Sequence, residues 1–183
     1  MSDPKNTLHW GTTQHRVLES PRHGTAVGIE SDYHGWLLNQ ASSLRERRVS
    51  SIDWIYLAEE LEAMASAERR TLKKQLKRLL MHLLKMRAQP SQTRRHGGWR
   101  KSIRDAREEL EDLIADSPGI FQGKRDEVLA QVYERAREAA VDETKLPLKD
   151  FPAVCPWTFE EILQKDFFPA PSQAGRLIAP ETR

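Results

Sequence analysis

Polar side chains recur along one edge of an otherwise apolar helical stripe. Glu68, Gln75 and His82 follow one another at intervals of seven residues, so a continuous helix places them along one edge. Carboxylate and imidazole groups at a seam between helices either hydrogen-bond to fix the pairing or bind a metal ion. Because the Glu-x-x-His spacing of di-iron bundles is absent here, we predict no metal, and an ion pair of Glu68 with Arg104 or Arg107. We call Glu68, Gln75, His82 and Arg107 the polar seam, and the potential metal ligands in this region are Glu60, Glu62, Glu68, His82 and Glu108.

Nucleophilic catalysis has little support in the sequence. Cys155 precedes Pro156 in an extended passage, not at a helix N-terminus, and no Gly-x-Ser-x-Gly elbow or phosphate-binding glycine loop occurs. His96 has no nucleophile motif beside it. We therefore predict no catalytic residue and no cofactor.

The strongest compositional feature is a run of positive charge from Arg69 to Arg107. Fourteen Lys and Arg face one acidic residue, Asp105, in this stretch, although the net charge of the whole chain is +2. The rest of the chain therefore carries a net charge of about −11. Clusters of this kind bind phosphates or acidic protein surfaces, and the first acidic surface available is the chain's own. We call the following residues the basic band: Arg70, Lys73, Lys74, Lys77, Arg78, Lys85, Arg94, Arg95, Arg100, Lys101 and Arg104.

A solvated helix face is the simplest interpretation of the basic band. However, positive charges repeat four residues apart at 70/74 and 73/77, which destabilises a helix by a few tenths of a kcal/mol per pair. Arg100, Lys101 and Arg104 fall in the first two turns of the next predicted helix, where the helix dipole disfavours cations. Both costs favour an anionic partner, whether internal or external.

Three functions follow as hypotheses. The first is a non-enzymatic module that binds a protein partner, or associates with itself, through the basic band. The second is a nucleic-acid-binding protein in which Arg94, Arg95 and His96 add phosphate contacts. Against this hypothesis, the sequence has no helix-turn-helix spacing, no zinc finger and no aromatic platform beyond Trp99. The third is a metal-dependent enzyme using Glu60, Glu68 and His82, which would have to converge in a cleft.

The composition predicts one domain without a membrane span. The chain has 183 residues, 38% of them hydrophobic, and a mean hydropathy of −0.68. No run of apolar residues is long enough for a membrane helix, and no secretory signal pattern occurs. The single cysteine, Cys155, favours a reducing compartment, and we predict a cytoplasmic protein. We expect a disordered extension over 1–30, one helical domain over 31–169 and a frayed tail over 170–183.

Helical periodicity predicts an all-α bundle of four main helices, with no strand pattern of useful length. The first follows Ser31 or Asp32, and the second follows Asp53 and carries a leucine stripe as far as Met86. So long a helix is unusual, and we expect a bend or break near 65–67. A loop over 90–98 separates it from a third helix over 99–114. Ser117 and Pro118 are predicted as the cap and first position before a fourth helix over 128–140.

A Pro-punctuated strap follows, extending from residue 146 to 168. The sequence from Thr158 to Glu161 is a capping box that opens a short last helix. The strap aromatics are predicted either to pack over one end of the bundle or to form an interface centre, and we expect Trp157 to be largely buried. These aromatics are Phe151, Trp157, Phe159, Phe167 and Phe168.

An ordered set of short motifs resembles a known family. They are Asp53-Trp54, Glu59-Glu60-Leu61-Glu62, Glu68-Arg69-Arg70, Leu79-Leu80 to His82-Leu83-Leu84-Lys85, Trp99, and Cys155-Pro156-Trp157-Thr158. From about Asp32 to Pro169 the chain resembles the bacterial domain-of-unknown-function family numbered twenty-nine. The resemblance implies a small helical bundle, widespread in cyanobacteria and other bacteria, whose activity is not established. Two features depart from the family pattern: Met86 stands where an aromatic is expected, and the first thirty residues are an extension.

Overall fold

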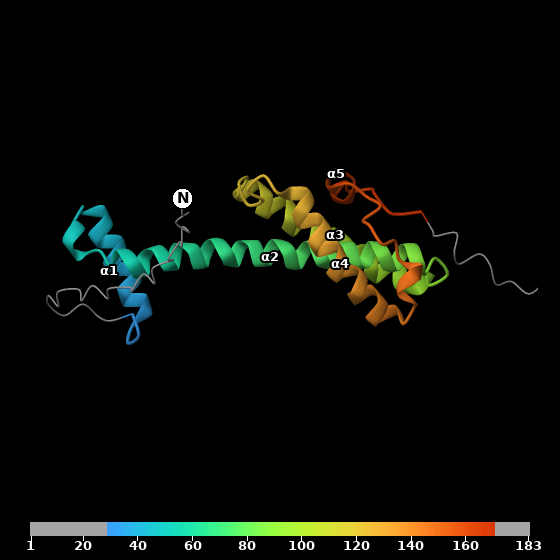
Figure 1. Cartoon of the computed structure of the whole chain (residues 1–183), viewed down its shortest axis with the longest axis horizontal. Coiled ribbons are helices and arrows are strands. Elements are labelled where there is room, and N and C mark those ends of the chain that lie inside the picture. Colours follow the sequence, from blue (N-terminus) through green and yellow to red (C-terminus); the bar gives the residue numbers. More distant parts are fainter. Residues whose placement is uncertain (1–28, 171–183) are drawn as a thin grey trace, which may run out of the picture. The chain divides into compact units, whose positions relative to one another are not determined.

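The computed structural model describes residues 29–170, and all regular structure within them is helical (Figure 1). This confirms the predicted all-α class. The extension and tail predicted over 1–30 and 170–183 lie almost entirely outside the described residues. The elements are α1 (Tyr33–Arg45), η1 (Val49–Ser51), α2 (Trp54–Ala88), α3 (Thr93–Asp116), α4 (Arg125–Thr144), η2 (Leu148–Asp150) and α5 (Phe159–Leu163).

The described residues fall into two compact units, one ending at Leu57 and one starting at Ala58. In the first unit, Asp32 caps α1 by accepting a hydrogen bond from the backbone N–H of Gly35 at 2.8 Å. The Gln40 side chain accepts another from the backbone N–H of Asp53 at 2.8 Å, which ties α1 to the start of α2. Trp36 is buried, with 4% of its surface exposed. The single domain predicted over 31–169 stays a prediction.

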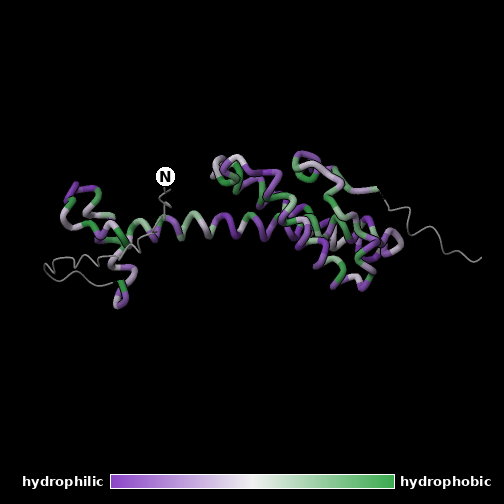
Figure 2. The backbone as a smooth tube through the Cα atoms, in the orientation of Figure 1, coloured by the Kyte–Doolittle hydropathy of each residue, from purple (hydrophilic) through white to green (hydrophobic). Residues whose placement is uncertain are grey.

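Helix α2 begins after Asp53 as predicted, but the break expected near 65–67 is wrong. The helix is continuous over 35 residues. Ala63, Ala65 and Ala67 have high helix propensity, and no Gly or Pro interrupts this segment, so nothing local opposes the helix. Hydrophilic residues are prominent along its middle (purple in Figure 2).

The apolar stripe of α2 is buried only in its second half. Leu76 and Leu83 are fully buried in a core that also contains residues of α3 and α4, as predicted. Upstream, Trp54, Leu61 and Met64 are exposed although they continue the same periodicity. Periodicity places these side chains on one side of the helix, and other elements decide whether that side is covered.

Helix α3 starts earlier than the sequence predicts. It begins at Thr93, so residues 93–98, including Gly97 and Gly98, are helical instead of forming a loop. Pro90 still ends α2, because the residue before a proline is disfavoured in helical geometry. The predicted role of Ser117 is also wrong: it is the C-cap of α3, and α4 starts only at Arg125.

The strap, residues 146–168, is held to the helices by its carbonyls and aromatic side chains. Tyr133 donates from its hydroxyl to the carbonyl of Pro152 at 2.8 Å, which satisfies a backbone acceptor outside regular structure. The capping box of Thr158 and Glu161 is confirmed. Phe151 and Phe159 are buried, and Trp157 is partly buried and packs against the same core.

Candidate functional site: a charged surface on α2 and α3

The α2 part of the basic band lies on the side of the helix away from its buried leucines. Arg70, Lys74 and Lys77 are exposed, and Lys73 and Arg78 are partly exposed. Within the described chain, none of the first three has a hydrogen bond or ion pair to a carboxylate. Their repulsion along the helix is therefore not offset by acidic residues in the described part of the chain.

The α3 part of the band is exposed at Arg94, Arg95, Arg100, Lys101 and Arg104. Because α3 begins at Thr93, its first turn holds Arg94 and Arg95, and no acidic residue offsets them there. The unfavourable interaction with the helix dipole, predicted for residues 100–104, therefore involves mainly these two arginines. Arg100 lies over the Phe168 ring, 4.2 Å from its centroid, so this cation also contacts the strap.

Asp105 is the carboxylate that joins the two parts of the band. It accepts a hydrogen bond from Lys101 at 2.8 Å and pairs with Arg78 across the helices at 3.7 Å. The hydrogen bond from Lys101 lowers the pKa of Asp105, and the charges of Lys101, Arg78 and Arg104 lower it further. One carboxylate among three cations leaves an excess of positive charge.

Lys85 belongs to the interior and not to the exposed band. It is 7% exposed, its ammonium pairs with the carboxylate of Glu143, and it lies 5.0 Å from the centre of the Trp99 ring. A buried ammonium requires such partners because the loss of hydration is costly. Its inclusion in the band was therefore wrong, and Trp99, itself buried, is no aromatic platform for bases.

The polar seam does not form the predicted ion pair. Glu68 is exposed and accepts a hydrogen bond from the hydroxyl of Ser117 at 3.1 Å, not from Arg104 or Arg107. The Gln75 side-chain oxygen and His82 Nδ1 are buried without a protein partner. Burial, reinforced by the charge of Lys85, lowers the pKa of His82 to about 4, so its imidazole is neutral at neutral pH.

Arg107 is the fourth seam residue, and it ties down the strap. It is 2% exposed and donates to the carbonyls of Ile162 at 2.7 Å, Lys165 at 3.0 Å and Phe167 at 2.7 Å. Burial lowers its pKa, as expected for a cation removed from water. Three carbonyl dipoles replace the carboxylate partner that the charge pattern predicted.

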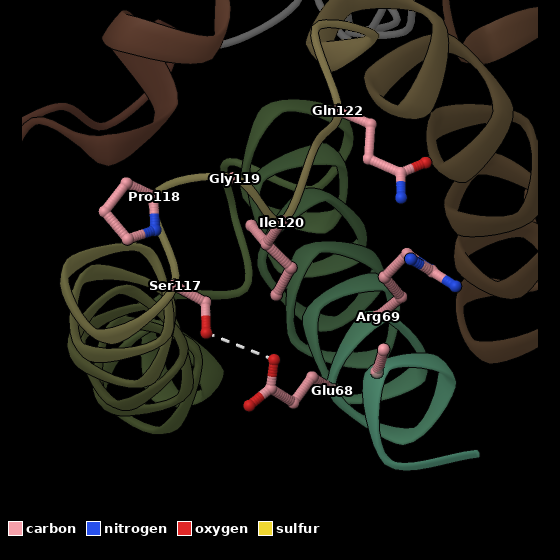
Figure 3. A pocket seen from close by; sticks show the side chains of 8 residues that line it. Glu68, Arg69, Ser117, Pro118, Gly119, Ile120 and Gln122 are labelled. Atoms are coloured by element: carbon pink, nitrogen blue, oxygen red, sulfur yellow. Dashed lines mark hydrogen bonds between the residues drawn. The ribbon is translucent and has the colours of Figure 1, made fainter. Parts of the chain in front are cut away.

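A recess lies where the α3–α4 connection meets α2 (Figure 3). Its volume is about 260 Å³, and Glu68 and Arg69 form its α2 wall. The hydrogen bond from Ser117 crosses the recess to Glu68 (dashed line in Figure 3). The opposite wall consists of Ser117, Pro118, Gly119, Ile120 and Gln122. Ser117 and Glu68 supply a hydroxyl and a carboxylate to this recess, and its lining residues include no histidine or cysteine.

Other catalytic or metal arrangements are not supported by the geometry. Across residues 29–170, no three His, Cys, Asp or Glu side chains are grouped so that they could hold a metal ion. Burial raises the pKa of Cys155, whose thiol donates to the Trp157 carbonyl at 3.3 Å. A thiol of raised pKa is a poor nucleophile at neutral pH.

The charge order along α3 is a feature that our sequence analysis missed. Its first part, up to Arg107, is rich in Lys and Arg, with Asp105 as the one acidic residue. Its last part, 108–116, contains Glu108, Glu109, Glu111, Asp112 and Asp116 and no cation. The signal for it in the sequence is the change of sign after Arg107 along residues 94–116.

The described residues therefore define a small all-helical protein with a charged helical exterior. No helix in the described part of the chain is long and apolar enough to cross a membrane. The chain matches the family described as "Domain of unknown function DUF29" over residues 29–168, and it belongs to that family. No curated protein and no solved structure was found to match it.

Proposed function

We propose that the chain is a protein-binding module that uses the basic band to engage an acidic protein surface. The supporting observation is the group of exposed cations on α2 and α3 that lack a carboxylate partner in the described chain: Arg70, Lys74, Lys77, Arg94 and Arg95. Unpaired surface cations attract an acidic partner and raise the rate of association. We also propose a cytoplasmic location, supported by the single, unpaired cysteine.

A protein partner is favoured over nucleic acid because the band lacks exposed aromatic rings. Single-stranded nucleic acids stack on such rings, whereas Trp99 is buried beneath Lys85. We expect nucleic-acid binding to be weak, non-specific and confined to low salt. The metal-dependent alternative has no supporting observation, since Glu60, Glu68 and His82 form no grouped set of ligands.

The test reverses the charge of Lys73, Lys74 and Lys77 to Glu in the full chain. Binding of a fluorescent polyglutamate peptide and of single- and double-stranded oligonucleotides is measured by anisotropy at several salt concentrations. The wild type should bind polyglutamate, and the triple variant should lose this binding while its melting temperature stays nearly unchanged, since solvated charges contribute little to stability. A matched control reverses Lys124, Lys145 and Lys149, which are exposed outside the band.

Two results would overturn the proposal. Tight, salt-resistant and sequence-selective binding to DNA or RNA by the wild type would make nucleic acid the partner. Failure of the wild type to bind polyglutamate at low salt would remove the basic band as a recognition surface.

A further inference from the structure

The exposed edge of α3 has a simple repeating geometry. Its residues are spaced by three or four, which places them along one side of a helix. Every one of them is exposed, whereas Ile103 and Leu110 on the opposite side are fully buried. The residues of this edge, which we call the α3 edge, are Arg94, Gly97, Lys101, Arg104, Glu108, Asp112 and Ala115.

The α3 edge changes sign once, between Arg104 and Glu108. Cations occupy its first half and carboxylates its second half. Among residues 29–170, Glu108 and Asp112 have neither an ion pair nor a side-chain hydrogen bond. Lys101 bonds to Asp105, but 71% of its side chain remains exposed. Both halves are therefore open to an outside partner.

This order of charges opposes the dipole of α3. Negative residues are favoured near a helix N-terminus and positive residues near a C-terminus, and α3 has the reverse arrangement at both ends. A second helix running antiparallel along the edge would offset this cost, if its own acidic end lay beside the basic end of α3. Such a helix needs the same charge order as α3 itself.

We propose that the partner of the α3 edge is a second copy of this chain, paired antiparallel through the same edge. This proposal rests on the proposed function. It identifies the acidic surface as Glu108 and Asp112 of the second copy, which Lys101 and Arg104 of the basic band recognise. A pair centred near Ala106 places Arg104 of one copy opposite Glu108 of the other, and Lys101 opposite Asp112. The two-fold axis repeats each contact, so the interface forms four charge pairs and closes as a dimer.

The ends of the edge allow the helices to approach. In this register Gly97 of one copy lies opposite Ala115 of the other, and both are small. Apart from its chain neighbours and the backbone of its own helix, no atom of the described residues lies within 4 Å of a Cβ built on Gly97, so this position is open. The contact from 97 to 115 is about 28 Å long at the standard helical rise. Because its contacts are mainly charged, the dimer should weaken as salt rises.

The first experiment measures the oligomeric state of the full chain by sedimentation equilibrium at low and high salt. The wild type should form a dimer at low salt. Lys101→Glu with Arg104→Glu, or Glu108→Lys with Asp112→Lys, should raise the dissociation constant by about tenfold or more, because four attractive contacts become repulsive. The matched control is Glu134→Lys with Glu138→Lys, two exposed carboxylates four residues apart on α4, which should leave the dimer unchanged.

Mixing the two double variants is the decisive measurement. One variant has carboxylates and the other has cations at all four pairing positions, 101, 104, 108 and 112, so neither should pair with itself. Together they should form a heterodimer at least as stable as the wild-type dimer. The pairing would be overturned if the two variants formed a heterodimer no more stable than that of either variant with the wild type. It would also be overturned if every variant still dimerised with itself as the wild type does.

The direction of pairing is tested with cysteines in a Cys155→Ser background. Gly97→Cys and Ala115→Cys are made in separate chains and oxidised alone and mixed. Antiparallel pairing predicts a disulfide-linked dimer mainly in the mixture, whereas efficient cross-linking of Gly97→Cys to itself would show parallel pairing and reject the proposal.

The two proposals can fail separately. If the wild type stays monomeric at low salt but binds polyglutamate through Lys73, Lys74 and Lys77, the self-pairing is wrong and the proposed function stands. If it neither dimerises nor binds polyglutamate, both are wrong.

Discussion

The two units of the chain treat apolar side chains in opposite ways. From residue 29 to residue 57, Trp36 and Ile52 are the buried large hydrophobic residues, while seven others are exposed: Tyr33, Leu38, Leu44, Val49, Trp54, Ile55 and Tyr56. From residue 58 onward a continuous core includes Leu72, Leu83, Ile103 and Leu110. The described part of the first unit, residues 29–57, is shorter than the segments that ordinarily bury enough surface to be stable alone. The second unit should therefore determine the global stability of the protein.

The largest effect should come from removing the strap by truncation after Asp150. This deletes the buried Phe151, Phe159 and Ile162 and removes the three carbonyl acceptors of the Arg107 guanidinium. We expect the free energy of unfolding to fall by about 5 kcal/mol or more, measured by urea denaturation. An unchanged melting temperature would mean that the strap aromatics serve a partner instead of the core.

A matched pair of leucine substitutions compares the units directly. Leu83→Ala should cost about 2 to 5 kcal/mol, because Leu83 is fully buried. Leu38→Ala should cost less than about 0.5 kcal/mol, because Leu38 is 59% exposed. Equal losses in urea denaturation would show that Leu38 is buried in solution and that the first unit also has a core.

Arg107→Met tests the polar attachment of the strap in the second unit. Three carbonyls lose their donor, and we expect a loss of about 2 to 4 kcal/mol in the same assay. Arg104→Met is the control, because this arginine is exposed and should cost less than about 0.5 kcal/mol. If both variants unfold at the same urea concentration, the carbonyl contacts contribute nothing measurable.

A smaller effect should appear on acidification, through His82 in the second unit. Its pKa falls from 6.5 to about 4 on folding, so between these values the unfolded chain binds more protons than the folded chain. Stability should therefore fall as the pH drops from 6.5 to 4, by at most about 3 kcal/mol and by less to the extent that water reaches the ring. His82→Gln should remove this part of the pH dependence, which urea titrations at pH 7 and pH 4.5 can measure.

Local signals in the sequence predicted the helices well. The start of α2 after Asp53 and the capping box at Thr158 were both confirmed, because caps act over three or four residues. The burial of Leu76 and Leu83 followed from periodicity. The start of α3 was missed because Gly97 and Gly98 favour a loop by propensity, and the helix nonetheless includes them.

Long-range relations could not be predicted in the same way. Periodicity placed Leu61 and Met64 on the apolar stripe, but it does not reveal that no element between residues 29 and 170 covers them. The charge pattern predicted that Lys85 lies at the surface, whereas it is buried. The same pattern predicted a carboxylate as the partner of Arg107, whereas its acceptors are backbone carbonyls of residues 162–167. Partners distant in sequence are decided by which chain segments meet in the fold.

The carbonyl contacts of Arg107 have a consequence for sequence variation in the strap. A backbone carbonyl is present in every amino acid, including proline, so the acceptors at Lys165 and Phe167 survive any substitution that keeps the path of the chain. Selection at these positions can therefore act on the path of the backbone in the strap. The residue type at position 165 can vary, because the side chain of Lys165 is exposed. Arg107 itself has no such freedom, since no other side chain offers five donors in a planar fork.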